Sequence, residues 1–182
     1  MKSVYEECLV YEKGLITLRK TNNEDLEELL ECYSDEKAVP LFNSDNCNGD
    51  NFNYTTIEQM EQAIEFWEAS YKNKEFVRWT VILKGTNKKI GTIEMFHRNA
   101  DDEFNHYGIL RIDLQSKYEI QSIIEDIVAI SNEYFFEAFE VKGILTKAIE
   151  KAEERICALK KAGFKPVYKK VMGYDDYYCR EV

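Results

Sequence analysis

The C-terminal half of this 182-residue chain constrains its fold most, because a strand, a long helix and a second strand follow one another without a glycine between Gly108 and Gly143. The spacing of apolar residues predicts these elements in order: a strand over Tyr107 to Leu114, a helix from about Lys117 to Ala138, a strand over Val141 to Ile149, and a helix from Glu153 to Ala162.

The remaining patterns predict further strands and helices of the same domain. They are a strand over Leu15–Arg19, a helix after the capping pattern Thr21–Glu24, an Asn-rich loop over residues 43–54, a helix starting near Thr55, a hairpin of Phe76–Leu83 with Lys89–Phe96, and a closing hairpin of Lys165–Val171 with Tyr174–Arg180. No linker or repeat interrupts the series. The chain therefore reads as one α/β domain spanning residues 1–182.

Composition excludes several function classes. The formal net charge is -10 and the pI is about 4.9, which opposes binding to nucleic acid and suits a cationic partner better. The five cysteines are scattered without a Cys-x-x-Cys pair, so neither a disulfide framework nor a metal site is expected. Apolar stretches are too short to cross a membrane, and acids near Met1 replace the apolar core of a signal peptide. We therefore expect a cytoplasmic protein.

Three segments carry a resemblance to a known family. Leu15–Arg19 is similar to the first strand of ribosomal-protein-type N-acetyltransferases, Lys89–Ile93 to a hairpin return strand, and Ile156–Phe164 to the closing helix. With the order of elements from Leu15 onward, the chain resembles the GNAT superfamily of N-acetyltransferases. The resemblance implies one GNAT-like α/β domain with a mixed central sheet of about seven strands and helices on both faces.

The resemblance also implies a site for acetyl-CoA at the end of the strand Tyr107–Leu114. The family's loop there holds the pyrophosphate with glycine amides at the start of the long helix. The matching positions are Ile112, Asp113, Leu114, Lys117, Tyr118, Glu119, Ile120 and Gln121. Here the glycines are absent, and Ser116 with Glu119 forms the pattern of a capping box that would satisfy the helix amides. A different register would place Gln115 and Lys117 on the phosphates.

Candidate catalytic residues follow from the same resemblance. His106 stands where many relatives carry the base, and Glu94 on the neighbouring strand is the second candidate. The usual acid, a tyrosine of the closing helix, is replaced by Leu159, and the usual cofactor-contacting asparagine by Ala152. Tyrosines 174, 177 and 178 of the last hairpin could supply the acid.

Two functions remain open from the sequence, beside a reading of the chain as an unrelated α/β binding protein. The first is an N-acetyltransferase that uses acetyl-CoA and acts on the amine of a small molecule or of a peptide or protein N-terminus. The second is a degenerate GNAT-like domain that no longer uses acetyl-CoA and serves as a binding or regulatory module. In either case the strands Tyr107–Leu114 and Val141–Ile149 should be parallel neighbours that separate toward their ends.

Overall fold

A computed structural model describes residues 3–42 and 51–182 of the chain. Their elements, in chain order, are β1 (Tyr11–Lys13), β2 (Ile16–Lys20), a short 3-10 turn (Asn23–Asp25), α1 (Leu26–Tyr33), α2 (Val39–Phe42), α3 (Ile57–Lys72), β3 (Val77–Leu83), β4 (Lys88–Arg98), β5 (Tyr107–Leu114), a second 3-10 turn (Ser116–Tyr118), α4 (Gln121–Ile130), a π-helical turn (Ser131–Phe135), α5 (Phe136–Ala138), β6 (Gly143–Lys147), α6 (Glu153–Lys161), β7 (Lys165–Pro166) and β8 (Tyr177–Glu181).

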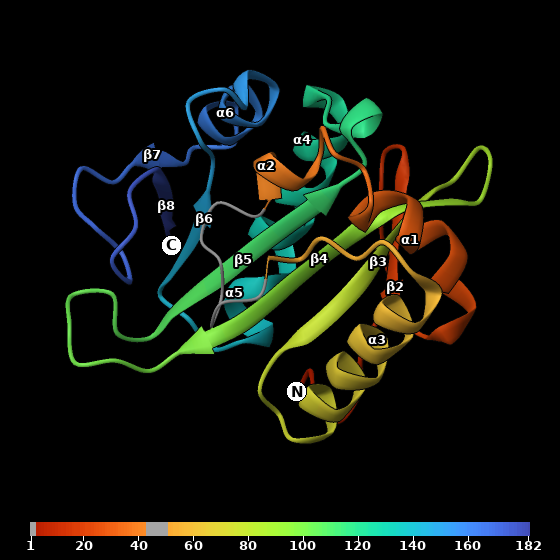
Figure 1. Ribbon diagram of the computed structural model, residues 1–182. Coiled ribbons are helices and arrows are strands. Elements are labelled where there is room, and N and C mark those ends of the chain that lie inside the picture. Colours follow the sequence, from red (N-terminus) through yellow and green to blue (C-terminus); the bar gives the residue numbers. More distant parts are fainter. Residues whose placement is uncertain (1–2, 43–50) are drawn as a thin grey trace.

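One eight-stranded sheet organises the molecule, in the order β1-β2-β3-β4-β5-β6-β8-β7 (Figure 1). Every neighbouring pair is antiparallel except β5 and β6, which are parallel. The α4 crossover between these two strands accounts for the exception, because a parallel connection needs a long return segment. The expected α/β class and mixed sheet are confirmed; β1, which the sequence patterns did not predict, brings the number of strands to eight.

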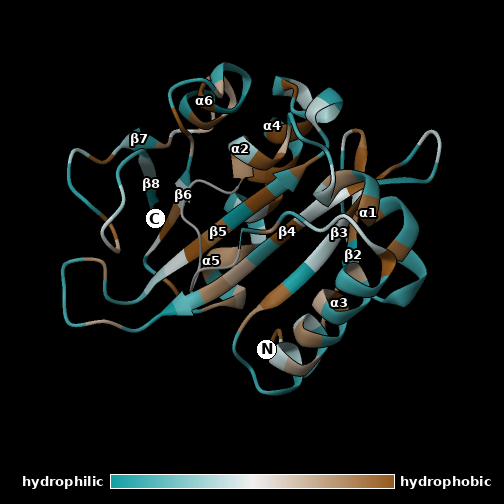
Figure 2. Cartoon of the chain, in the orientation of Figure 1, coloured by the Kyte–Doolittle hydropathy of each residue, from teal (hydrophilic) through white to brown (hydrophobic). Residues whose placement is uncertain are grey.

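Helices cover both faces of the sheet. On one face α4 and α6 pack over a large apolar cluster, in which Trp79 of β3 stacks on Phe135 with 5.0 Å between ring centroids. On the other, α1, α2 and α3 enclose a second cluster that includes Tyr33 and Trp67. Hydrophobic residues line β5 and α4, whereas the loop that joins β4 to β5 is hydrophilic (Figure 2). The two faces thus have separate cores divided by the sheet.

Local signals predicted the capping turn before α1 and the start of α3 closely, whereas α2 was not predicted. Thr56 caps α3 through a capping box with Gln59, close to the predicted start. Near the first helix the capping box joins Asn22 and Asp25, one residue later than the Thr21–Glu24 pattern, because Asp25 is also bound by Arg19 and Thr80. Most of the predicted Asn-rich loop, residues 43–50, lies outside the described residues.

Gly91 shows why β4 can lie so close to β5. Its backbone has φ +153°, next to an irregularity in the pairing of β3 with β4. A side chain at this position would collide with the carbonyl oxygen of Asp113 in β5. A residue without Cβ is therefore needed where the two strands approach.

Candidate functional site

Strands β5 and β6 begin as a pair and then separate. Tyr107–Leu110 pairs with Gly143–Thr146, after which β5 continues to Leu114 while remaining bonded to β4 on its other edge. In Figure 1 the two ribbons diverge toward α2 and α6. The prediction of adjacent, parallel strands that separate is confirmed. The separation leaves β5 from Arg111 onward without a paired strand on the β6 side, within the part of the chain that the structure describes.

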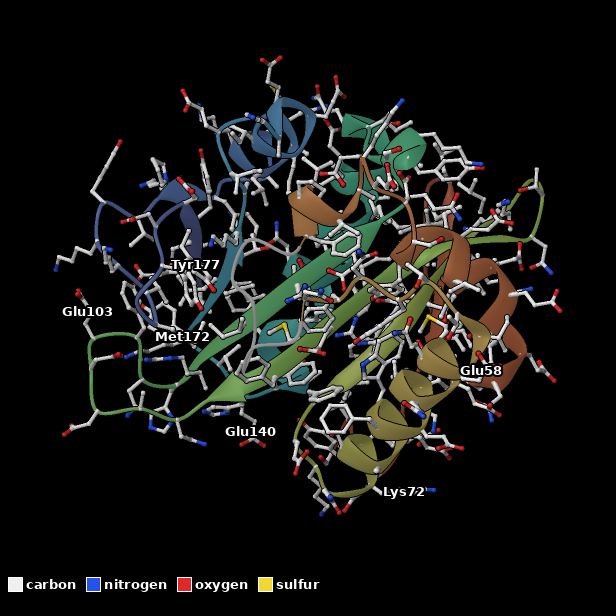
Figure 3. The ribbon with its side chains drawn as sticks, in the orientation of Figure 1. Glu58, Lys72, Glu103, Glu140, Met172 and Tyr177 are labelled. Carbon is white, nitrogen blue, oxygen red and sulfur yellow. The ribbon has the colours of Figure 1, made fainter. Side chains whose placement is uncertain are left out.

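A cavity of about 20 Å³ lies where the strands separate. It has room for about one water molecule. It is lined by Leu41, Phe42, residues 109–112 of β5, Thr146, Lys147, Arg155 and Tyr177. Tyr177, labelled in Figure 3, comes from β8, where it pairs with Lys147. Side chains therefore fill most of the gap between the strands.

The loop after β5 does not form the predicted helix start. Ser116–Tyr118 is a 3-10 turn, Glu119 and Ile120 have non-helical backbone angles, and α4 begins only at Gln121. The Ser116–Glu119 capping box is absent, because neither side chain caps a helix there. The predicted helix start at Lys117 is therefore wrong, and Ile120, just before α4, is 41% exposed. Contacts with distant residues set the path of this loop.

Two carboxylates from other elements accept hydrogen bonds from the backbone of the loop. Asp35, between α1 and α2, accepts from the Ser116 N–H at 2.8 Å, and Glu154 of α6 accepts from the Gln121 N–H at 2.7 Å. Burial raises the pKa of Asp35, but hydrogen bonds from Ser116, Lys37 and Ala38 together outweigh it and leave the pKa below its ordinary value. An acidic group, Glu154, therefore occupies the Gln121 amide, which lies among the positions that the family resemblance assigned to the cofactor.

The side chain of Glu119 forms a buried ion pair with Arg155. Arg155 of α6 donates two hydrogen bonds to the Glu119 carboxylate, from Nε at 2.6 Å and from an Nη at 2.8 Å. Arg155 is 2% exposed and Glu119 is 8% exposed. This bidentate ion pair explains why Glu119 does not cap α4, because a buried guanidinium needs a carboxylate more than a helix amide does. It also places a positive charge beside the cavity.

A second group of buried charges lies on the sheet face under α1 and α3. Arg78 of β3 binds Asp113 at 3.0 Å and forms a short ion pair with Glu94. Arg111 binds Asp113 at 2.9 Å and donates to the Phe42 carbonyl at 2.6 Å. Tyr33 and Thr92 complete the network around Asp113 and Arg78. Burial raises the pKa of Tyr33 well above its ordinary value, which keeps this hydroxyl protonated as a donor to Asp113.

The two candidate bases lie at different distances from the separating strands. Glu94 pairs in register with Arg111, the first β5 residue beyond the last β5–β6 pair. His106 precedes the paired residues at the closed end of β5; its backbone has φ +62°, and its ring bonds to His97 at 2.9 Å. His106 therefore lies at the closed end of the paired strands, away from the place where β5 and β6 separate after Leu110.

The predicted cofactor-binding residues are dispersed. Ile112 and Leu114 lie in the apolar core, and Asp113 lies in the charged network on the opposite face. Lys117 is exposed, with its ammonium 5.1 Å from the Tyr118 ring. Leu159 and Ala152 of the closing helix are buried, and the Tyr174 ring lies 4.6 Å from the Lys147 ammonium.

Arg155 was missed by sequence reasoning, although a signal was present. It lies three and four residues before Ala158 and Leu159, so helical spacing puts it on the buried face of α6. A charged residue on an apolar face needs a partner. Asp35 gave no such signal, since only the folded chain brings it to Ser116.

Comparisons with known proteins identify the family. A family model described as "Acetyltransferase (GNAT) domain" matches residues 16–165. The chain belongs to the GNAT acetyltransferase family. A curated relative, the uncharacterized N-acetyltransferase YoaA of Bacillus subtilis, is 28% identical over 91 residues, which is 50% of this chain. The match spans only 47% of that relative's length.

Solved structures share the fold of this GNAT chain. The ribosomal-protein-S5-alanine acetyltransferase of Vibrio fischeri superposes with a TM-score of 0.71 at 18% identity, covering 95% of this chain and 96% of the other. RimJ of Mycobacterium smegmatis, solved with a CoA-disulfide, gives 0.70 at 12% identity over 92% and 82%. At these identities the likeness concerns the fold alone.

Within the described residues, no helix combines the length and apolar character required to cross a bilayer. Over the same residues, no cluster of three or more His, Cys, Asp or Glu side chains could hold a metal ion.

Proposed function

We propose that this GNAT chain transfers the acetyl group of acetyl-CoA to an amine of a small molecule or of a protein N-terminus. The observation that carries the proposal is the separation of β5 from β6 after Leu110. It leaves a free strand edge beside a cavity, where an extended thioester arm could add to β5. The net charge of -10 favours a cationic amine as acceptor.

The reaction asks little of the protein beyond positioning. The amine nitrogen bonds to the thioester carbonyl carbon, the carbon–sulfur bond breaks, the amine proton passes to a base, and the CoA thiolate takes up a proton. We assign the base to Glu94, because it lies one strand from the gap, and keep His106 as the alternative. The acid is proposed to be Tyr177, which lines the cavity.

The loop in its present arrangement does not fit the pyrophosphate. The Glu119 carboxylate occupies the Arg155 guanidinium, and two further carboxylates bind loop amides. A phosphate placed there would meet carboxylates within about 4 Å, a repulsion of roughly 1–4 kcal/mol. This observation favours the second candidate function, a degenerate GNAT domain that does not use acetyl-CoA.

Chromatographic detection of CoA released from acetyl-CoA in the presence of a panel of amines and peptides tests the proposal. Separation by chromatography is needed because the chain's free cysteines react with thiol reagents. We expect amine-dependent CoA release, lowered roughly 10²- to 10⁴-fold in a folded Glu94→Gln variant. A Glu103→Gln variant, which changes an exposed loop carboxylate, is the matched control.

Each outcome bears on one assignment. A loss of rate in His106→Ala and not in Glu94→Gln would move the base to the histidine. Absence of amine-dependent release, with the fold intact by circular dichroism, would support the degenerate domain.

A further inference from the structure

The Glu119–Arg155 ion pair is hard to explain by stability alone. Both side chains are almost wholly withdrawn from water, at 6% and 3% exposed. Desolvating two charges costs about as much as their attraction returns, so such a pair adds little net stability. The Arg78 side chain donates hydrogen bonds to four side chains, whereas the Arg155 side chain donates, within the described residues, only to Glu119.

Arg155 contacts two parts of the site. Its side chain lines the cavity between β5 and β6, and its guanidinium holds the loop that precedes α4. A ligand whose thioester lies between the strands and whose phosphates reach this loop would pass the guanidinium. A planar guanidinium binds carboxylate and phosphate with the same two-pronged geometry.

An independent feature of the cavity also indicates a ligand. Thr146 of β6 lines the cavity and is 1% exposed, and its hydroxyl has no hydrogen-bond partner among the described residues. A buried hydroxyl without a partner is costly in a folded protein. An amide of an extended acyl-carrier arm between β5 and β6 would supply that partner.

The loop is built so that Glu119 can leave. Glu119 and Ile120 lie between the 3-10 turn and α4, outside any regular helix. Ile120, the residue after Glu119, is 41% exposed, so its own side chain contributes little packing at this junction. A carboxylate that swings out regains its hydration, whereas Arg155 is held by α6, whose Leu159 is fully buried.

From these observations we propose that Arg155 is the pyrophosphate-binding residue of this chain and that Glu119 occupies it when no cofactor is bound. Binding of acetyl-CoA then exchanges the carboxylate for phosphate on the same guanidinium. This inference rests on the proposed use of acetyl-CoA and adds the residue that replaces the missing glycine amides. Glu119 thereby acts as an internal competitor for the cofactor.

Calorimetric titration of the full chain with acetyl-CoA and with S-acetylpantetheine, which lacks the pyrophosphate, tests the exchange. In Glu119→Gln the competitor loses its charge, so acetyl-CoA should bind roughly 10- to 100-fold more tightly while S-acetylpantetheine is unaffected. Glu125→Gln is the matched control, because Glu125 also links α4 to α6 through an ion pair, with Lys161 at 2.7 Å, but on the exposed surface. It should leave both affinities unchanged.

A double variant tests the role of Arg155 while removing both charges of the buried ion pair, so neither is left without a partner. Glu119→Gln combined with Arg155→Met should lose the gain in affinity while remaining folded by circular dichroism. The proposal is overturned if the double variant keeps the gain, if Glu119→Gln and Glu125→Gln behave alike, or if S-acetylpantetheine shows the same gain.

The same titrations separate this inference from the proposed function. If the native chain transfers acetyl groups and Glu119→Gln binds acetyl-CoA no more tightly, the function stands and the exchange is overturned. If no folded variant binds acetyl-CoA, both are overturned.

Discussion

The two groups of buried charges in this molecule are held in different ways. Arg78, Arg111, Glu94 and Asp113 lie on three neighbouring strands of a continuous sheet, and each contacts partners on other strands or helices. Glu119 and Arg155 join a non-helical loop to one helix at the place where the sheet opens.

This difference separates a structural network from an exchangeable contact. In the network, loss of one member removes a partner from several buried groups at once, and β-sheet hydrogen bonds prevent those groups from moving into water. In the pair, one member lies on a loop and can move into water. The first group is expected to stabilise the fold, and it also holds Glu94, the proposed base. The second is expected to control access to the site.

Breaking the network should produce the largest loss of stability. Arg78→Met leaves Asp113 and Glu94 buried without their shared cation, so the free energy of unfolding should fall by about 3–5 kcal/mol. Urea unfolding followed by tryptophan fluorescence and by circular dichroism measures it. Lys169→Met, which breaks an exposed ion pair with Glu103, serves as the control. A loss no greater than that of the control would show that the network contributes no stability.

Breaking the pair should cost less, although it is buried to a similar degree. Arg155→Met frees Glu119, which can turn toward solvent from its loop, so we expect a loss of about 1–3 kcal/mol in the same urea assay. Faster hydrogen exchange in the loop over residues 116–121 should accompany it. If the cost equals that of Arg78→Met, Glu119 cannot leave, and the proposed exchange loses its physical basis.

The smallest effect concerns Asp35, which joins the turn after α1 to the same loop. Its pKa is lowered in the folded state, so its contribution is present above the unfolded-state pKa of about 3.9 and is lost as pH falls through the folded-state value. Asp35→Asn should lower stability by about 0.5–1 kcal/mol near neutral pH, because solvent screens a partly exposed carboxylate. The thermal unfolding midpoints of the two proteins should begin to converge as the pH falls below about 4 and meet below the folded-state pKa of Asp35. If the stability difference between the native chain and Asp35→Asn does not depend on pH, the effect comes from packing and not from the charge of Asp35.

Much of the fold followed from local patterns. Strand β5 was predicted with its observed bounds, and α6 to within one residue, because their apolar spacing agrees with their burial. The loop after β5 could not be predicted in this way. Its sequence satisfies a capping box, but a tertiary partner, Arg155, attracts the Glu119 side chain more strongly than the helix amides do.

The candidate site was predicted less well than the fold, for the same reason. Glu119 was correctly placed among the residues of the loop, but its partner lies 36 positions further along the chain. His106 was proposed from the family resemblance, but it precedes the first β5–β6 pair and so lies at the closed end of the strands, a position that only the folded chain shows. The burial of Arg155 can be predicted from helical spacing alone, because it shares one face of α6 with Ala158 and Leu159.

Titration of the native chain with acetyl-CoA tests most directly the claim that acidic side chains occupy the pyrophosphate site. We predict weak binding, with a Kd of about 0.1–1 mM. Replacing Glu119 and Gln121 with glycine should strengthen it, although two glycines near a helix start cost roughly 1 kcal/mol each in stability. Low-micromolar binding by the native chain would contradict the account, because the Glu119 carboxylate would then not compete for the site.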